Sequence, residues 1–251
     1  MENKQKLQHV NQWRTCRLEK RGRVYVLTLT GKDDHRFNPS SIDDIAAALK
    51  TIEQSPDAGA LVTTNEGRFF SNGLDLKWIK DNLSSSGLTI IQDKFEGLLC
   101  LMMKLGIPTV AAICGHAAAG GFMLALAHDY RFMKDGKEVL YMSELDHGMF
   151  MPRSLMAVIK SKIVMANTLI DVVLKAKKFR ASEGFDSGFV NGVYEDSAKT
   201  LEAAILEAEK LASRNWKRDS YANLRAASFP GVVEELEAHR DPYVWRLGSR
   251  M

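Results

Sequence analysis

The sequence lacks the short motifs that mark several large enzyme classes. It contains neither GxGxxG nor GxxxxGK[ST], the two usual glycine-rich segments that hold nucleotide phosphates. GxSxG, HExxH and paired CxxC segments are also missing. These absences argue against the hydrolases, zinc enzymes and nucleotide-dependent enzymes that carry such motifs, and we predict no metal site.

Cysteine is scarce, with only Cys16, Cys100 and Cys114 in 251 residues. Their number is odd, no two have CxxC spacing, and Cys100 and Cys114 stand among apolar residues. We therefore expect free, buried thiols rather than disulfides or metal ligands, as in a protein of a reducing or intracellular compartment.

No block of the chain concentrates charge of one sign. The net charge is +3 and the pI is about 8.7, with lysines and arginines spread along the sequence. A nucleic-acid-binding protein gathers its basic residues in a patch, so no nucleic acid partner is expected. Residues 1–14 are polar and hold no apolar stretch, so no secretory signal is predicted.

One stretch, 106–127, has the length of a membrane helix and no charged residue apart from a histidine that can be protonated. Pro108, Gly115, Gly120 and Gly121 interrupt it, and β-branched residues fill only its first part. We interpret it as a buried strand, a turn and a buried helix, and we predict no membrane span.

Strands and helices alternate through the first half of the chain. Apolar runs predict strands over 23–30, 59–64, 108–113, 129–133 and 138–142. Helical periodicity predicts helices from 39 to about 56, over 76–81 and 89–105, up to 127, and over 154–175, 197–213, 217–227 and 232–239. A polar loop is expected at 65–76 (NEGRFFSNGLDL), and a loop or lid at 84–86. This order indicates one α/β domain with a helical C-terminal part.

Two glycine-containing loops each follow a buried strand and each lead into a helix. The first is FFSNGLD (69–75) and the second is GHAAAGGF (115–122). Glycine lets a ligand approach main-chain amides, and a helix N-terminus adds N–H groups without partners. If the loops meet, two backbone donors form an oxyanion hole. The alternative is a pair of ordinary strand-to-helix turns, with His116 as a packed, hydrogen-bonded core group.

A third segment, LYMSELDHG (140–148), places Glu144 after an apolar strand and between apolar neighbours. A carboxyl group in such surroundings is desolvated and its pKa is raised, as a general base requires. The alternative is a helix N-cap or a turn carboxylate.

Taken together, the three segments resemble the crotonase (enoyl-CoA hydratase/isomerase) superfamily in content, order and spacing. FFSNGLDL is followed about 45 residues later by GHAAAGGFMLALAHDYRF, and then by LYMSELDHG. The resemblance covers residues 23–193, including ASEGFDSGFV (181–190). CRLEKRGRVYVLTLTG and HRFNP are especially similar to plant peroxisomal Δ3,Δ2-enoyl-CoA isomerases.

The resemblance implies an α/β fold, a crotonase-type spiral of repeated ββα units with a helical C-terminal region. Residues 1–195 then form the core that binds acyl-CoA, and 196–251 form helices of the same domain that make trimer contacts. A homotrimer or a dimer of trimers is expected. Trp216, Phe229 and Trp245 are interface anchors or, equally, core residues.

For the site, the resemblance assigns the two oxyanion-hole amides to Asn72 and Gly120 and the proton-transferring base to Glu144. Asp75 is expected to tie the first loop together rather than touch substrate. The residues implied in substrate binding are Ser71, Asn72, Gly73, Leu74, Asp75 and Gly120. Arg36 and Lys77 are candidates for contact with coenzyme A phosphates. Coenzyme A is part of the substrate, so no cofactor is expected.

Hydratases of the family hold or activate water with a further glutamate, three residues after the second oxyanion glycine. Met123 stands at that position here, and a thioether cannot activate water. One base, Glu144, is enough to shift a double bond from a 3-enoyl-CoA to a 2-enoyl-CoA, so the pattern is that of an isomerase. Met149, Phe150 and Met151 line an apolar acyl tunnel or belong to the core.

Alternative functions are a 2-enoyl-CoA hydratase or another crotonase activity, a catalytically weak acyl-CoA-binding protein, and RNA binding. The modest net charge and the missing lysine cluster argue against RNA. The final residues, Ser249-Arg250-Met251, resemble a peroxisomal address read by an import receptor. Combined with fatty-acyl chemistry, they predict a peroxisomal protein.

Overall fold

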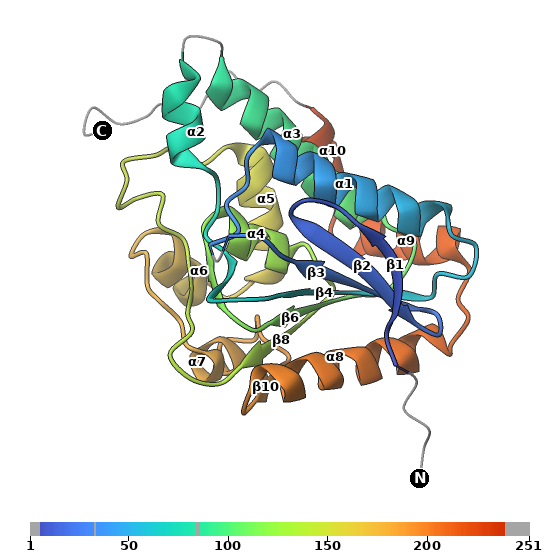
Figure 1. The fold of residues 1–251 in the computed structure, drawn as a ribbon. Coiled ribbons are helices and arrows are strands. Elements are labelled where there is room, and N and C mark those ends of the chain that lie inside the picture. Colours follow the sequence, from blue (N-terminus) through green and yellow to red (C-terminus); the bar gives the residue numbers. More distant parts are fainter. Residues whose placement is uncertain (1–5, 33, 84–85, 239–251) are drawn as a thin grey trace.

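Two β-sheets form the framework of the computed structural model, which describes residues 6–32, 34–83 and 86–238 (Figure 1). The large sheet has seven strands, in spatial order β1 (Gln8–Gln12), β2 (Cys16–Arg21), β3 (Val24–Leu29), β4 (Ala60–Asn65), β6 (Thr109–Ile113), β8 (Tyr130–Lys134) and β10 (Gly192–Tyr194). The first three strands pair antiparallel, and all pairs from β3 to β10 are parallel. The small sheet has the parallel order β5 (Phe69–Ser71), β7 (His116–Ala118) and β9 (Leu140–Tyr141).

A repeated unit connects the two sheets. Each of β4, β6 and β8 continues into a short strand of the small sheet and then into helix. The helices that follow are α2 (Leu76–Asp81) with α3 (Gly87–Lys104), then α4 (Gly120–Leu126), and then α5 (Arg153–Lys162). The predicted spiral of ββα units is confirmed.

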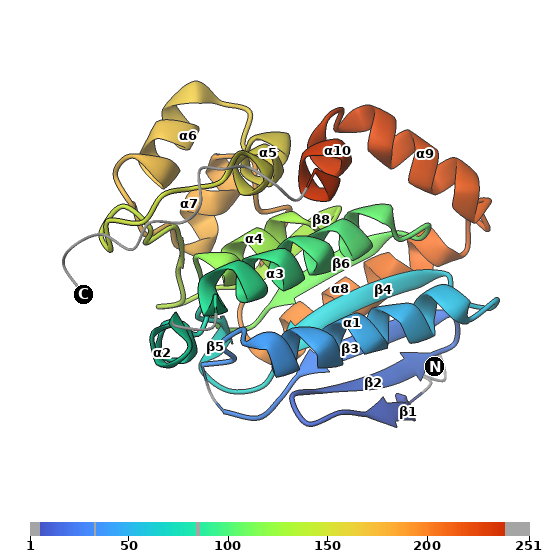
Figure 2. The ribbon, with the colours of Figure 1, turned by 90° about the horizontal axis from the view of Figure 1, so that it is seen from above.

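Helices cover both faces of the large sheet (Figure 2). One face carries α1 (Pro39–Gln54), α3 and α4, and α8 (Ser197–Ala212) lies along the other against β3, β4, β6, β8 and β10. The remaining helices are α6 (Ala166–Val173), α7 (Ala181–Asp186), α9 (Arg218–Ser228) and α10 (Val232–Glu237). α10 packs against α3 and α5.

Local sequence explains why α1 begins where it does. The Asn38 side chain accepts from the Ser41 amide, the Ser41 hydroxyl accepts from the Asn38 amide, and Pro39 opens the first turn. Ile45 and Leu49, four residues apart on one face, are buried. The apolar period read from the sequence therefore marks the face that packs on the core.

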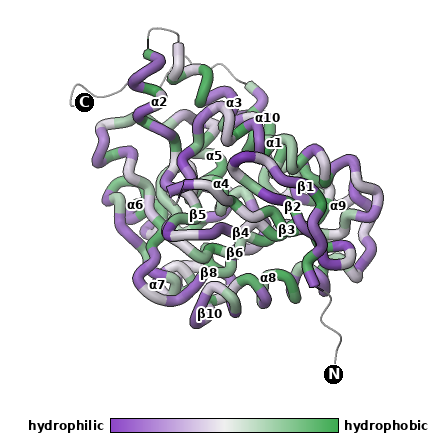
Figure 3. Tube along the Cα trace, viewed as in Figure 1, coloured by the Kyte–Doolittle hydropathy of each residue, from purple (hydrophilic) through white to green (hydrophobic). Residues whose placement is uncertain are grey.

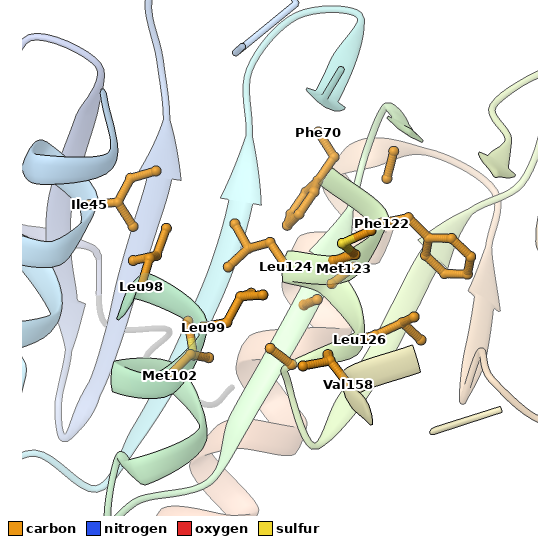
Figure 4. Close-up of a cluster of buried hydrophobic side chains, with 14 of the residues drawn as sticks. Ile45, Phe70, Leu98, Leu99, Met102, Phe122, Met123, Leu124, Leu126 and Val158 are labelled. Carbon is orange, nitrogen blue, oxygen red and sulfur yellow. The ribbon is translucent and has the colours of Figure 1, made fainter. Parts of the chain in front are cut away.

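The core divides between the two faces of the sheet. The central strands β4 and β6 are buried along their length, as expected for parallel strands covered on both sides, although β4 ends in the polar residues Thr63, Thr64 and Asn65. The edge strand β1 is largely hydrophilic (Figure 3). The larger cluster lies on the side of α1, α3 and α4 and includes Leu99, Phe122 and Met123 (Figure 4). A smaller cluster joins the sheet to α8.

Several elements differ from the sequence-based prediction. β1 and β2 had not been predicted, and three-residue strands β5 and β7 replace parts of the predicted loops. The helix predicted over 154–175 is wrong, because the backbone leaves the helix at Ile163 and separates α5 from α6. Beyond it, α7 and β10 occupy a segment that had been described only as mostly helical.

The cysteines, the apolar stretch and the aromatic residues of the C-terminal helices can each be located in the described part of the chain. Cys16 and Cys114 are free and buried, and Cys100 is free and half-buried. No helix within the described ranges is long and apolar enough to cross a membrane. Trp216 is 44% exposed and stacks on Tyr221, and Phe229 is half-buried beneath the Lys162 ammonium. Trp245 and Ser249-Arg250-Met251 lie outside the described residues.

Candidate active site

The two glycine loops touch. Gly73 has φ +75°, and a side chain there would place its Cβ 3.2 Å from the Gly120 nitrogen and 3.1 Å from the Ala118 oxygen. A Cβ on Gly121 would lie 2.2 Å from the Ser71 carbonyl oxygen. Real Cβ atoms essentially never come as close to backbone as at Gly121, and at Gly73 a tight approach is combined with a left-handed backbone that favours glycine, so both glycines allow the loops to meet.

Side-chain hydrogen bonds from Ser71 and Asp75 fix the conformation of the first loop. The Ser71 hydroxyl donates to the His35 carbonyl (2.8 Å) and accepts from the Gly73 amide (3.2 Å). The Asp75 carboxylate accepts from the Trp78 amide (3.1 Å) and caps α2, as its expected tying role requires. Ser71 and Gly73 do not line the cavity described below and instead shape the loop, while Asp75 lines a neighbouring cavity.

The backbone donors of the first loop are not those expected from the sequence. The Asn72 N–H donates to the Asp34 carbonyl at 2.8 Å and is therefore engaged. On either side of Leu74, the Gly73 carbonyl accepts from the Phe37 amide and the Asp75 amide donates to the Phe37 carbonyl, both at 2.8 Å. In such a bridge the N–H between them points away from the partner strand.

Two amides are consequently left without acceptors. Within the part of the chain that the structure describes, neither the Leu74 N–H nor the Gly120 N–H donates to a protein oxygen. Gly120 is the first residue of α4, where intrahelical acceptors are lacking by construction. The Asn72 amide chosen from the sequence is thus already engaged, and the two amides without an acceptor among the described residues are those of Leu74 and Gly120.

A cavity of about 380 Å³ opens where the loops meet. Asn72, Leu74, Gly120 and Glu144 all line it, so four residues named from the sequence come together there. Its wall also includes Met123, the residue at the position of the second hydratase glutamate. Met123 comes from α4 and is buried beside Phe122 and Leu124 (Figure 4).

Glu144 carries the unusual electrostatics of the cavity. Glu144 is the first residue of the turn that follows β9, and it is only 6% exposed. Burial raises the carboxyl pKa from 4.5 to about 7, against the lowering effect of the Glu144 and Ser143 backbone amides. One carboxylate oxygen, Oε2, is buried and has no hydrogen-bond partner among the described residues. The turn location and the raised pKa are thus both present, and a buried acceptor without a protein donor marks Glu144 as a candidate functional group.

Around the mouth of the cavity, basic groups gather. Arg36 lines both this cavity and a neighbouring one of about 800 Å³ and pairs with Asp34 (2.7 Å). Lys77 lines only the neighbouring cavity, and its 83% exposed side chain pairs with Asp81. Lys178, which had not been predicted from the sequence, lines the first cavity with its ammonium 5.2 Å from the Tyr141 ring centre.

The structure also locates the other side chains for which the sequence left two interpretations open. Met149 lines the cavity and, like Met151, also packs against the core, whereas Phe150 is 58% exposed. His116 is half-buried, and its Nδ1 accepts from the Val139 amide at 3.1 Å. The Val139 hydrogen bond supports the interpretation of His116 as a packed, hydrogen-bonded group.

Comparison with known families gives the same assignment as the geometry. The family described as enoyl-CoA hydratase/isomerase matches residues 19–241. The chain belongs to this family. Among its relatives is the peroxisomal enoyl-CoA delta isomerase 2 of Arabidopsis thaliana, 39% identical over 86% of this chain and 92% of the relative. Enoyl-CoA delta isomerase 3 of the same plant is 39% identical over 88% and 95% of the two chains.

Solved structures share the fold at lower sequence identity. An enoyl-CoA isomerase of Mycobacterium tuberculosis superposes with a TM-score of 0.81 at 20% identity, over 90% of this chain and 96% of that one. An enoyl-CoA hydratase of Mycobacterium marinum gives 0.80 with the same coverage and identity. At this identity the likeness shows the fold, and the residues of the cavity must decide the activity.

Proposed function

We propose that the protein is a Δ3,Δ2-enoyl-CoA isomerase of fatty acid β-oxidation, which moves the double bond of a 3-enoyl-CoA to give a 2-trans-enoyl-CoA. The observation that carries the proposal is the cavity itself. It combines one buried carboxylate, Glu144, with two amides, Leu74 and Gly120, whose N–H groups meet no acceptor within the described ranges. Met123 stands where a hydratase needs a second acid.

Each step uses a group of this cavity. The Glu144 carboxylate removes a proton from C2, and the electron pair moves into the thioester, giving a dienolate. The same carboxyl group then returns the proton to C4, and the double bond closes between C2 and C3. A pKa of about 7 suits a group that must both take and give a proton near neutral pH.

The dienolate oxygen needs donors that are already in position. The Leu74 and Gly120 amides supply them, in place of the Asn72 and Gly120 pair expected from the sequence. Each such donor lowers the barrier by about 3–4 kcal/mol, because it is aimed at the charge before the charge forms.

Substrate recognition follows the charges at the mouth. Arg36, Lys77 and Lys178 offer cations to the coenzyme A phosphates, and Arg36 stands between the two cavities. Asn72 and Leu74 line the path of the thioester. Coenzyme A arrives as part of the substrate, so the proposed chemistry uses no separate cofactor.

The setting is proposed on the names of relatives and on the sequence. Two of the Arabidopsis isomerases are named peroxisomal and a third is not. Ser249-Arg250-Met251 would carry this chain to the peroxisome through an import receptor. A homotrimer or dimer of trimers is the assembly that we propose.

The test supplies purified protein with 3-hexenoyl-CoA and with 2-trans-hexenoyl-CoA in separate assays. An isomerase produces the ultraviolet absorbance of the conjugated thioester from the first substrate and leaves the second unhydrated. Rapid conversion of the second substrate to 3-hydroxyhexanoyl-CoA, with no turnover of the first, would replace the proposal with a hydratase. Tight acyl-CoA binding with no turnover of either substrate would leave only a binding protein.

A further inference from the structure

The inner end of the cavity is a wall of three apolar side chains from three helices. Phe95 of α3, Met123 of α4 and Leu155 of α5 all line the cavity, and each is 1% exposed. By contrast, Asp146, His147 and Lys178 line its outer part and are exposed. The cavity is thus open at a polar rim and closed at an apolar end.

A buried polar contact ties two of these helices together directly behind the wall. The Ser154 hydroxyl donates to the Glu96 carboxylate at 2.9 Å, and Gln92 donates to the same oxygen at 2.9 Å. Ser154 and Glu96 are 6% and 3% exposed, and they precede and follow Leu155 and Phe95 in the chain. Such a satisfied buried contact fixes helix positions, so the wall cannot easily move back.

Phe95 is held from two further sides. Its ring stacks on Phe37 with centroids 5.3 Å apart, and its Cζ lies 3.1 Å from the position that a Cβ on Gly120 would occupy. Outside the wall, α10 packs against both α3 and α5. The inner end of the cavity therefore stands next to the Gly120 donor and has core behind it.

We propose that Phe95, Met123 and Leu155 set the acyl chain length that this site accepts, and that short- to medium-chain 3-enoyl-CoAs are its substrates. This inference rests on the proposed isomerase function. At roughly 30 Å³ for a group of the size of water, 380 Å³ holds about a dozen non-hydrogen atoms. The thioester and the start of the pantetheine arm occupy some of that space, which leaves room for a hexenoyl or octenoyl chain.

The test compares kcat/KM for 3-hexenoyl-CoA and 3-dodecenoyl-CoA. A chain too long for a closed apolar pocket loses about tenfold or more, since even one methylene that does not fit costs about that factor. We expect at least this preference for the shorter substrate. Leu155→Ala removes an isopropyl group from the wall and should shift the preference toward longer chains by about the length of that group, whereas Leu155→Phe should strengthen the preference for the hexenoyl substrate.

Ile159→Ala is the matched control. Ile159 lies four residues further along α5, is fully buried and does not line the cavity. Its substitution removes a similar amount of side chain, so it should lower stability and leave the chain-length ratio unchanged. A flat profile in the unaltered protein, or an equal shift in Ile159→Ala, would overturn the proposal.

A second measurement separates this proposal from the proposed function. Calorimetric binding of saturated hexanoyl-CoA and dodecanoyl-CoA reports the length of the pocket without any turnover. Suppose that no 3-enoyl-CoA is isomerised but the binding ratio still favours hexanoyl-CoA and shifts in Leu155→Ala. The isomerase proposal is then wrong, and the chain-length proposal is supported. Turnover of every substrate with equal binding of both thioesters would support the function and overturn the chain-length proposal.

Discussion

Replacing Glu144 by glutamine should lower activity and raise stability together. Glutamine keeps the shape of the side chain but cannot take the C2 proton. General base catalysis contributes about 10²- to 10⁴-fold, so we expect isomerisation of 3-hexenoyl-CoA to fall by at least about 100-fold. Acyl-CoA should still bind, because the cavity and the two amides are unchanged.

The stability gain follows from the cost of burying the charge. The folded protein raises the Glu144 pKa from 4.5 to about 7. Between these pH values the folded state keeps a proton that the unfolded chain has lost, so this carboxyl group makes the protein less stable as pH rises through the window. Above pH 7 the full cost is present, and a shift of this size corresponds to about 3 kcal/mol.

Denaturant unfolding at two pH values measures this cost. At pH 8, Glu144→Gln should be more stable than the unaltered protein by up to about 3 kcal/mol, and near pH 4.5 the two should converge. Asp146→Asn serves as the stability control, since it removes an exposed carboxylate from the rim of the same cavity and should change stability by less than about 0.5 kcal/mol.

Two results would contradict this assignment. If Glu144→Gln keeps more than a tenth of the isomerase activity, Glu144 is not the base. If its stability at pH 8 equals that of the unaltered protein, the carboxylate is solvated in the folded state and its pKa is not raised.

Three further predictions concern the same framework. Because the base must be ionised, kcat/KM should fall as pH decreases through about 7, and a flat profile between pH 6 and 8 would contradict the role of Glu144. Gly121→Ala would force a Cβ to within 2.2 Å of the Ser71 oxygen, so a loss of more than about 2 kcal/mol on denaturant unfolding and most of the activity is expected. Arg225→Met would leave the Asp129 carboxylate buried without its ion-pair partner at 2.6 Å. Thermal and denaturant unfolding should then show a free energy of unfolding lower by about 3–5 kcal/mol, while the pH dependence of kcat/KM stays unchanged.

The parts of the fold that sequence could predict are those with a long, regular signal. β4 contains the apolar, β-branched stretch ALVTT, β6 is a mostly apolar run, and α1 has both a cap and a period, so each was predicted within one or two residues. Strands β5 and β7 have three residues each and pair only with one another and β9, so no alternation marks them. The backbone leaves the helical conformation at Ile163, where no glycine or proline in the sequence signals the end of the helix.

The candidate site also has a part that the sequence could predict and a part that it could not. The raised pKa predicted for Glu144 is present, but its immediate sequence neighbours do not bury it, because Ser143 is polar and Leu145 is 55% exposed. The desolvation comes from the fold around the side chain.

The choice between Asn72 and Leu74 as donor needs more. Alternation along an extended segment would point the Asn72 and Leu74 amides to the same side, because they are two residues apart. The left-handed Gly73 between them (φ +75°) breaks that alternation, and Asp34 and Phe37, more than thirty residues upstream, supply the partners that engage the Asn72 amide and leave the Leu74 amide without one.

The distinction between isomerase and hydratase depends on a physical difference within one cavity. A second carboxylate beside Glu144 would raise the cost of ionising either one, and it would give water a place to be held and activated. Met123 supplies neither charge nor a strong hydrogen-bond acceptor, so the wall facing the substrate stays apolar. In the proposed mechanism no group then activates water against the dienolate, and a single acid carries the proton from C2 to C4. If both proposals hold, the methionine that replaces the second hydratase acid also closes the end of the acyl pocket, so reaction type and chain length depend on one residue.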